Sequence, residues 1–412
     1  MRSSLLSFAV VVLAATSAWA QPVEPANDQS VAMPAAAAPE AAPVVVDQGA
    51  EPICPCRAAE ALLDNGAAKF KSGDFEMTLH GRLNVWAGWL GDDSRMSEGD
   101  KMDQPGFRLR RARLGVEGQI IQPITYKIEM DLFDKSLSGG PLYQAWVDFT
   151  PIQYIGLKVG FMEYPLVRGM DAGSFGLAHL DRAVGTYAMS PTNSLGAVLH
   201  SEPWKDHLVL SFGVFNGLER ADSFFAGYQP VGISEGNRFE KLSYVGRVDL
   251  IPMDKLGEGE ADVKQVKSCR LGLGGGVMYS DGTSVGTLGA AAWLHLKAWG
   301  FHLNSDFIWD RSKPKSDAGQ TQIPATTTRM AVQGSVGYVF LKDLLGLAAR
   351  VEYVNSDTEL QNEGDQVIAA ATLSYYAIGN WVKVQVEYQH RQELHGLTLH
   401  NDHVMAGVQA AF

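Results

Sequence analysis

Charged side chains recur at every second position along several segments of the chain. Arg111 and Arg113 flank an alanine, and Lys127, Glu129 and Asp131 alternate with apolar residues shortly afterwards. In an extended chain, a spacing of two places side chains on the same face. Rows of charge on one face of a sheet attract or repel ions, which is the chemistry of an ion-conducting wall.

Two glycine-rich motifs suggest other chemistry. Residues 282–286 (GTSVG) match the nucleophile elbow of serine hydrolases, which requires a strand, a turn and a helix; the flanking pattern here predicts a hairpin. Residues 272–276 (GLGGG) resemble a phosphate-binding loop, but no helix follows. A barrel hydrolase using His and Asp is an alternative, although His80, His295 and His302 are expected to line a lumen or sit in polar contacts. We expect no enzyme and no cofactor.

Potential metal ligands are few and scattered. Cys54 and Cys56 flank a proline without a nearby His or second Cys pair, so we expect no metal site there. A disulfide from this pair to Cys269 and an intermolecular bridge both remain open, and an odd total leaves at least one thiol unpaired within the chain. Four acids either hold a divalent cation or form a solvated loop: Asp92, Asp93, Glu98 and Asp100.

The first 20 residues predict a secretory signal peptide. Arg2 precedes an apolar run from Leu5 to Ala15, and Ala18-Trp19-Ala20 gives a small-residue cleavage pattern. The apolar run is too short to cross a bilayer as a helix. We therefore exclude residues 1–20 from the fold and expect an exported protein.

Residues 21–73 predict a periplasmic extension. Pro and Ala dominate residues 21–52, which lack the apolar surface needed to fold. Residues 57–70 have the spacing of one short helix. The net charge of the whole chain is −12, which argues against nucleic acid as a partner.

Residues 74–412 predict an all-β fold, a transmembrane antiparallel β-barrel. Apolar and polar residues alternate in segments of roughly nine to fourteen residues, longer than ordinary strands and long enough for tilted membrane strands. Short and long connections also alternate, as in bacterial barrels. We predict about sixteen strands, starting near Met77, Phe107, Thr125, Tyr143, Ile155, Ser194, His207, Lys241, Cys269, Gly286, Gly300, Thr328, Leu345, Gln366, Val382 and Asn401.

One connection does not fit this scheme, and the C-terminus adds a further signal. The turn from Ile251 to Lys267 is too long, and the sequence gives no account of it. The last strand ends in Phe412, which resembles the terminal strand that outer-membrane barrels present to their assembly machinery. We therefore expect that machinery, outer-membrane lipid and lipopolysaccharide as partners, with localisation in the outer membrane of a Gram-negative bacterium.

The inward face of this barrel carries both signs of charge. A charge on the lipid face costs roughly 2–4 kcal/mol for Arg or Lys near the midplane, so the charged positions must point inward. The eleven basic positions are Arg82, Arg111, Arg113, Lys127, Lys158, Arg247, Lys297, Arg329, Arg350, Lys383 and Arg391. The nine acidic positions are Glu117, Glu129, Asp131, Asp148, Asp249, Asp306, Asp310, Glu352 and Glu387.

Three segments resemble the phosphate-selective porin O and P family: FRLRRARLGVEGQI (107–120), DLFDK…LYQAWVDFTP (131–151) and GLKVGFMEYPL…DRAVGTY (156–187). The resemblance implies a sixteen-stranded barrel, usually a homotrimer, whose long third loop folds inward; residues 162–193 lie where that loop should be. If this loop forms the constriction, Arg168, Asp171, Asp181 and Arg182 help to line it. The family's phosphate-selective members carry a ladder of arginines and a lysine cluster, whereas acids accompany the basic residues here.

We predict an outer-membrane porin for passive diffusion of small hydrophilic solutes, with a weak preference for anions, phosphate among them. The pore-lining residues are predicted to be Arg82, Arg111, Arg113, Lys127, Lys158, Arg247, Arg329, Arg350, Glu129 and Asp131. The same charges have a structural interpretation, in which Arg113 pairs with Glu129 or Arg111 with Asp131. A general non-selective porin and a barrel that anchors the envelope through its N-terminal extension are the alternatives.

Overall fold

The computed structural model describes residues 68–90, 106–133, 141–171, 173–221, 224, 227–232, 236, 239–257, 259–316, 323–341, 343–398 and 401–412. The predicted signal peptide, nearly all of the extension, Cys54, Cys56 and the acids between residues 92 and 100 lie outside these ranges, so these predictions stay predictions. Cys269 is half-buried just before strand β12.

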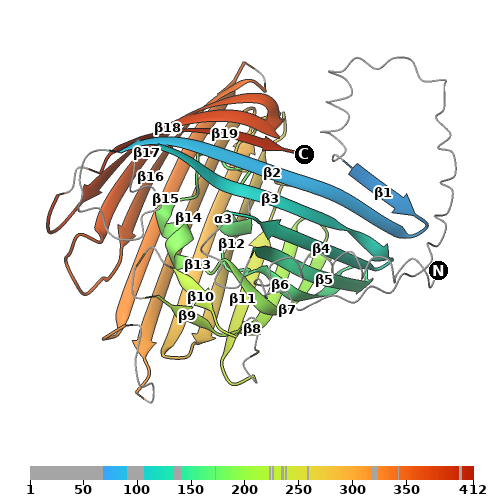
Figure 1. Cartoon of the computed structure of the whole chain (residues 1–412), viewed down its shortest axis with the longest axis horizontal. Helices are drawn as coiled ribbons and strands as arrows, with labels where there is room; N and C mark the ends of the chain where they lie inside the picture. Colours follow the sequence, from blue (N-terminus) through green and yellow to red (C-terminus); the bar gives the residue numbers. More distant parts are fainter. Residues whose placement is uncertain are drawn as a thin grey trace, which may run out of the picture. The chain divides into compact units, whose positions relative to one another are not determined.

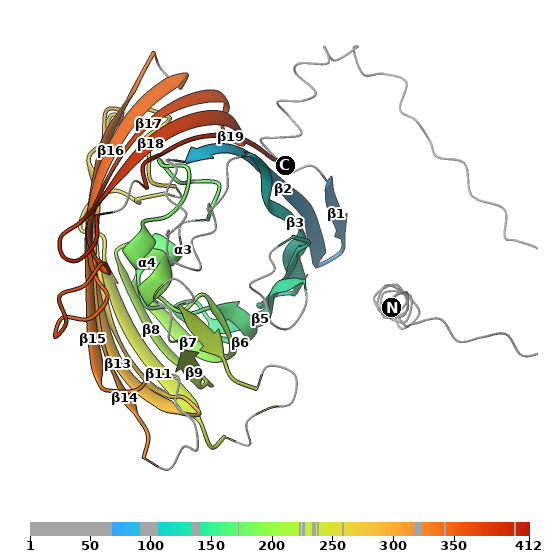
Figure 2. The same ribbon diagram turned by 60° about the vertical axis from the view of Figure 1, so that its left-hand side comes forward.

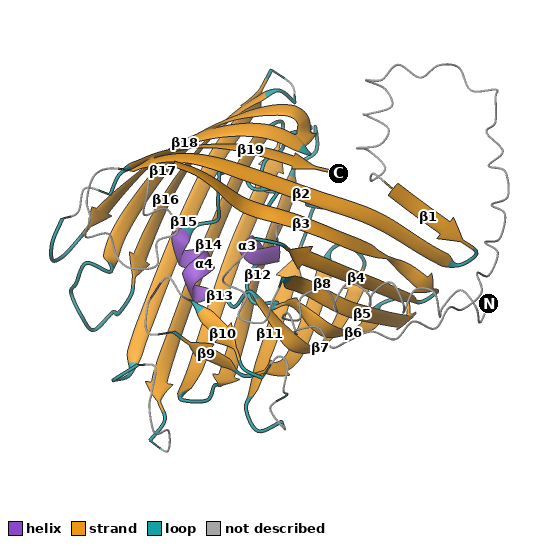
Figure 3. Ribbon diagram, in the orientation of Figure 1, coloured by secondary structure: helices purple, strands orange, loops and turns teal. Residues whose placement is uncertain are grey.

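Sixteen antiparallel strands form a closed barrel (Figures 1 and 3). Each strand pairs with its neighbour along the wall, and β19 pairs with β2 to close it. The strands are β2 (Phe75–Leu90), β3 (Gly106–Ile121), β4 (Ile124–Asp131), β5 (Leu142–Ile152), β6 (Ile155–Glu163), β7 (Asn193–Trp204), β8 (Leu208–Asn216), β11 (Leu242–Leu250), β12 (Arg270–Asp281), β13 (Val285–Ala298), β14 (Phe301–Pro314), β15 (Thr327–Phe340), β16 (Leu345–Asn355), β17 (Asp365–Asn380), β18 (Val382–Glu393) and β19 (His403–Ala411).

The predicted strands are confirmed, and each observed start lies within two residues of the predicted one. Apolar and polar residues alternate along each strand because one face of the wall contacts lipid and the other faces the lumen. Apolar side chains such as Val277, Leu347 and Val408 are exposed on the outside, whereas Arg350 and Glu387 are buried inside. Every unsatisfied backbone group is costly in lipid, and closure of the barrel leaves no free sheet edge there.

A further strand, β1 (Ala68–Ser72), forms a hairpin with the first residues of β2. It lies within the range that the sequence assigned to the extension. The predicted helix over residues 57–70 is wrong for residues 68–70, which are strand because they pair with β2, and residues 57–67 lie outside the described ranges. The partners of β19 on β2 run only from Arg82 to Leu90, so residues 75–79 of β2 extend beyond β19. Strand β1 covers this edge, which would otherwise present unpaired backbone groups.

The connection between β6 and β7 folds into the barrel and carries two short helices, α3 (Arg168–Asp171) and α4 (Val184–Met189) (Figure 2). This confirms an inward third loop, which we call the inner loop (residues 164–192). Its apolar side chains, including Tyr164, Leu166 and Met189, pack against the wall residues Phe215 and Trp293. Among the described residues, no helix is long and apolar enough to cross a membrane.

The connection from β11 to β12, residues 251–269, also folds into the lumen, which explains its length. We call it the inner turn. Its Leu256 joins the core beneath the inner loop, while Ala261 and Val263 pack with Ala178 of that loop. The Glu260 carboxylate accepts a hydrogen bond of 2.8 Å from the Ala178 amide. The two inward segments therefore support each other.

A small hairpin of β9 (Leu218–Arg220) and β10 (Tyr228–Pro230) lies in the connection between β8 and β11. It contacts the GTSVG motif, where the Ser284 hydroxyl donates to Glu219. That motif connects β12 to β13 in a hairpin and is followed by a strand, not the helix of a nucleophile elbow.

Candidate functional site in the barrel lumen

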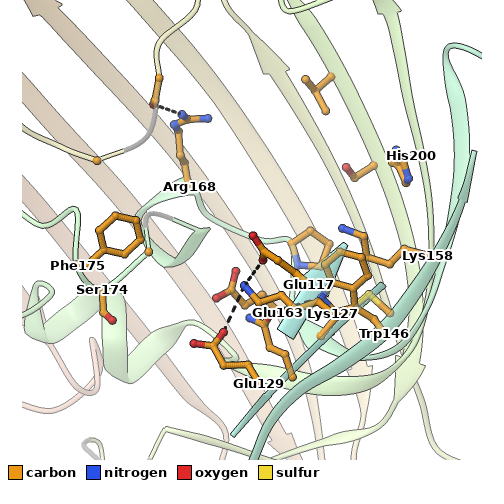
Figure 4. A pocket seen from close by; sticks show the side chains of 18 of the residues that line it. Glu117, Lys127, Glu129, Trp146, Lys158, Glu163, Arg168, Ser174, Phe175 and His200 are labelled. Atoms are coloured by element: carbon orange, nitrogen blue, oxygen red, sulfur yellow. Dashed lines mark hydrogen bonds and ion pairs between the residues drawn. The ribbon is translucent and has the colours of Figure 1, made fainter. Parts of the chain in front are cut away.

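A cavity of about 730 Å³ occupies the part of the lumen next to strands β2–β8 and β11. Residues of the inner loop (Arg168, Ser174 and Phe175) and of the inner turn (Lys255 and Leu256) line its other side. The cavity runs as far as the turn at Asp206, at the barrel end with the short connections. Figure 4 shows this cavity, with Arg168, Ser174 and Phe175 of the inner loop on one side and Lys158 and His200 of the wall on the other.

Alternating charges on neighbouring strands meet in this cavity. The Lys127 ammonium lies 3.4 Å from the Glu117 carboxylate of β3 and 3.3 Å from that of Glu129, as Figure 4 shows. The Arg82 guanidinium is 4.0 Å from Glu129. On β11, Arg247 and Asp249 pair at 2.7 Å. Basic and acidic groups thus neutralise one another along the wall at short range.

Aromatic rings support three of the cations. The Arg82 guanidinium lies 4.5 Å from the centre of the Phe175 ring, which belongs to the inner loop. Arg113 stacks 3.5 Å from the Tyr143 ring, and the Lys158 ammonium lies 4.3 Å from the Trp146 ring. The ring faces carry partial negative charge, so they stabilise these cations in addition to the acids that pair with Arg82 and Arg113.

The structural interpretation of Arg111 and Arg113 holds, but with other partners than predicted. Arg113 donates to Asp131 at 2.7 Å instead of to Glu129, because the β3–β4 register places Asp131 directly opposite Arg113. Arg111 donates to Asp181 of the inner loop at 2.8 Å instead of to Asp131. The register differs by two residues from the one that the sequence suggested, with an irregularity between Gln119 and Ile121.

Asp181 anchors the inner loop to the wall. Its carboxylate accepts hydrogen bonds from Arg110, at 3.1 and 2.9 Å, and from Arg111. Although burial raises the pKa of Asp181, the Arg110 and Arg111 charges hold it well below its usual range. The ionised carboxylate therefore stabilises the folded loop at any pH above the usual carboxyl pKa. This contribution is lost only when the pH falls through the lowered pKa of the folded state.

The other predicted loop residues have separate roles. Arg168 lines the cavity, donates to the Gly257 carbonyl of the inner turn at 3.4 Å and lies over the Trp293 ring. Arg182 is buried and donates to the Gly169 and Met170 carbonyls, so it holds the loop's own backbone. Asp171 ends α3, and its side chain lies outside the described part.

On the wall opposite the cavity, the inward-facing arginines are buried. Arg329 is fully buried and donates to Asp310. Arg350 forms an ion pair with Glu352 and donates to the Asp181 carbonyl. Like Arg111 and Asp131, they do not line the cavity. Six of the ten predicted pore-lining residues line the cavity: Arg82, Arg113, Lys127, Lys158, Arg247 and Glu129.

Comparison with known proteins agrees with this architecture. Residues 83–231 match the phosphate-selective porin O and P family. The predicted resemblance is therefore confirmed over these residues. No curated protein sequence matches the chain. The match and the apolar outer surface of the barrel place this porin in the outer membrane of a Gram-negative bacterium.

Solved structures with this fold are distant in sequence. The outer membrane channel DcaP of Acinetobacter baumannii is 14% identical with a TM-score of 0.54, over 84% of this chain and 100% of its own. OprB of Pseudomonas putida is 13% identical with a TM-score of 0.51, over 86% and 96%. In-vitro folded OmpT of Vibrio cholerae, described as a trimer form, is 12% identical with a TM-score of 0.51, over 82% and 99%.

Sequence reasoning missed part of the porin's cavity lining. Alternation placed Glu117 and Asp249 on the inward face but gave no sign that they reach the open lumen. His200, whose Nε2 lies 2.9 Å from Asp148, could have been found from the same alternation on β7. Phe175 and Lys255 come from irregular segments, where no period exists to indicate their direction.

Proposed function

We propose that this porin conducts small hydrophilic solutes by passive diffusion, with a weak preference for anions and no special affinity for phosphate. The near balance of charge in the cavity supports this proposal. Seven basic residues line it: Arg82, Arg113, Lys127, Lys158, Arg168, Arg247 and Lys255. Six acidic residues line it: Glu117, Glu129, Glu163, Glu202, Asp206 and Asp249.

The pairing of these charges argues against tight anion binding. Conduction requires binding sites weak enough for the solute to leave. Lys127, Arg247 and Lys255 each have a carboxylate within 3.4 Å inside the cavity. A phosphate would have to displace these acids, since strong phosphate sites present several charge-assisted donors together. The excess of one basic residue then gives a small bias toward anions.

The bias is measurable as a reversal potential across a planar bilayer under a KCl gradient. One net charge about 10 Å away in water contributes roughly 0.4 kcal/mol, so we expect chloride to be favoured over potassium by roughly two- to fourfold. Lys127→Gln leaves Glu117 and Glu129 without their shared cation, and we expect the ratio to fall to about one or below.

Lys313→Gln is the matched control, because Lys313 is exposed on β14, away from the strands that line the cavity. It should keep the wild-type reversal potential. A potassium preference in the wild-type protein would leave a general or cation-preferring porin. An unchanged potential in the Lys127 variant would show that the cavity charges do not set selectivity.

We also propose a homotrimer. Strand β4 has 8 residues and β6 has 9, whereas β13, β14 and β15 have 14 each. A tilted strand needs about 9–11 residues to span the bilayer. The wall at β4–β6 is thus short for lipid and suited to contact with a neighbouring protomer, and the OmpT structure in trimer form supports such an assembly. Unheated electrophoresis of the purified protein should give a band of three protomers.

A further inference from the structure

Arg220 of β9 is a buried cation without a partner in the part of the chain that the structure describes. Only 4% of its surface is exposed. Its Nε and Nη1 atoms are enclosed by protein and make no hydrogen bond. A buried guanidinium that loses water without gaining partners costs several kcal/mol, so such an arrangement indicates a missing ligand.

A second arginine adds to the same excess of positive charge. Arg329 of β15 lies near Arg220, as does Asp310 of β14. The Asp310 carboxylate accepts hydrogen bonds from Arg329 Nε at 3.0 Å and from the Tyr228 hydroxyl at 2.7 Å. Arg329 Nη1 is buried and has no partner. Asp310 thus bonds Arg329 and acts on Arg220 only through its charge, and three nitrogen atoms of the two guanidinium groups make no hydrogen bond.

Two further acids of the described ranges, Glu219 and Asp357, form their hydrogen bonds elsewhere. Glu219, the preceding residue of β9, accepts from the Ser284 amide at 3.1 Å and from its hydroxyl. Asp357 accepts from the Glu359 amide at 3.1 Å, and its charge reaches Arg220 only at longer range. Burial, together with the charge of Arg329, lowers the pKa of Arg220 to about 10, so the side chain stays protonated at neutral pH.

We propose that Arg220, together with Nη1 of Arg329, forms an anion-binding site beneath the β9–β10 hairpin, toward the barrel end with the long loops. Its ligand is a small anion, either a halide or one oxygen-bearing face of phosphate. A bound water molecule would not balance the positive charge of the buried Arg220 guanidinium. The site is separate from the cavity, since neither arginine lines it. A bound anion would join the hairpin to strands β14 and β15.

An anion that binds the folded protein raises its melting temperature with concentration. The experiment measures thermal unfolding of the purified full-length porin in detergent. Sodium gluconate keeps the ionic strength constant while sodium chloride, or in a second series sodium phosphate, replaces it. We expect a rise of about 2–4 °C over a hundredfold range of chloride or phosphate in the wild-type protein. Arg220→Gln should lose this rise, and Lys205→Gln, at the exposed turn between β7 and β8, should keep it.

The two series identify the ligand: a rise with chloride alone indicates a halide site, and one with phosphate alone an oxyanion site. No rise in the wild-type protein with either salt overturns the proposal, and so does an equal rise in Arg220→Gln. A crystal of the wild-type protein in sodium bromide gives a readout that needs no variant. If chloride is active, an anomalous peak should lie within hydrogen-bond distance of Arg220, and a peak only elsewhere overturns the site.

Discussion

Asp181→Asn is expected to release the inner loop, producing larger and noisier single-channel currents. The wild-type carboxylate accepts from Arg110 and Arg111 and holds the loop against β3. The variant keeps the shape but removes the charge that balances two buried guanidinium groups. Breaking a fully buried ion pair by removing one partner costs about 3–5 kcal/mol, and the cost here is lower because the Asp181 side chain is 27% exposed. Irregular segments open at the low end of the range of local stabilities, so this loss is enough to loosen the loop. Single-channel recording in planar bilayers measures the effect.

Asp343→Asn is the control for this prediction. It makes the same chemical change at an exposed turn between β15 and β16, and it should leave conductance and noise at wild-type values. The barrel wall does not depend on Asp181, so the variant should still insert and run as a folded protein on unheated gels. A quiet channel of wild-type conductance in Asp181→Asn would show that the apolar packing of Tyr164 and Leu166 holds the loop alone.

The barrel could be predicted because its wall is periodic. On β4, Lys127 and Glu129 face the lumen while Ile128 and Met130 face lipid, and the membrane imposes this difference on every strand. The inner loop was expected from the family resemblance. From the sequence, the inner turn could be recognised only as a connection whose length had no explanation. Neither Leu256 nor Glu260 belongs to a repeating pattern that would predict its buried contact.

The division of the lumen charges could not be predicted for the same reason. Alternation shows that Arg329 and Lys127 both point inward, but it does not show what fills the space in front of them. Arg329 lies behind the β9–β10 hairpin, whereas Lys127 faces the open cavity. The fold of the irregular segments inside the barrel decides which inward charges face the permeating solute and which ones bind a loop.

Replacing residues 253–266 of the inner turn by Asn-Gly is expected to raise conductance several-fold. This change removes Lys255 and Leu256 from the cavity lining and takes away the Glu260 contact that supports Ala178. The Lys297 ammonium donates to the Leu256 and Gly259 carbonyls, so without the inner turn it would lose both partners and add a new cation to the lumen surface. The variant therefore also carries Lys297→Met, which keeps the volume of the side chain and removes its charge.

Lys297→Met alone separates the two effects. With the inner turn present, the wall on its side of the lumen stays covered, and we expect conductance close to that of the wild type. The short-turn variant should instead show a wider channel and a weaker exclusion of large solutes, measured by polyethylene glycol block of increasing size. Wild-type conductance in the short-turn variant would mean that the inner loop alone sets the narrowest section, because only that segment would then remain between the cavity and the opposite wall.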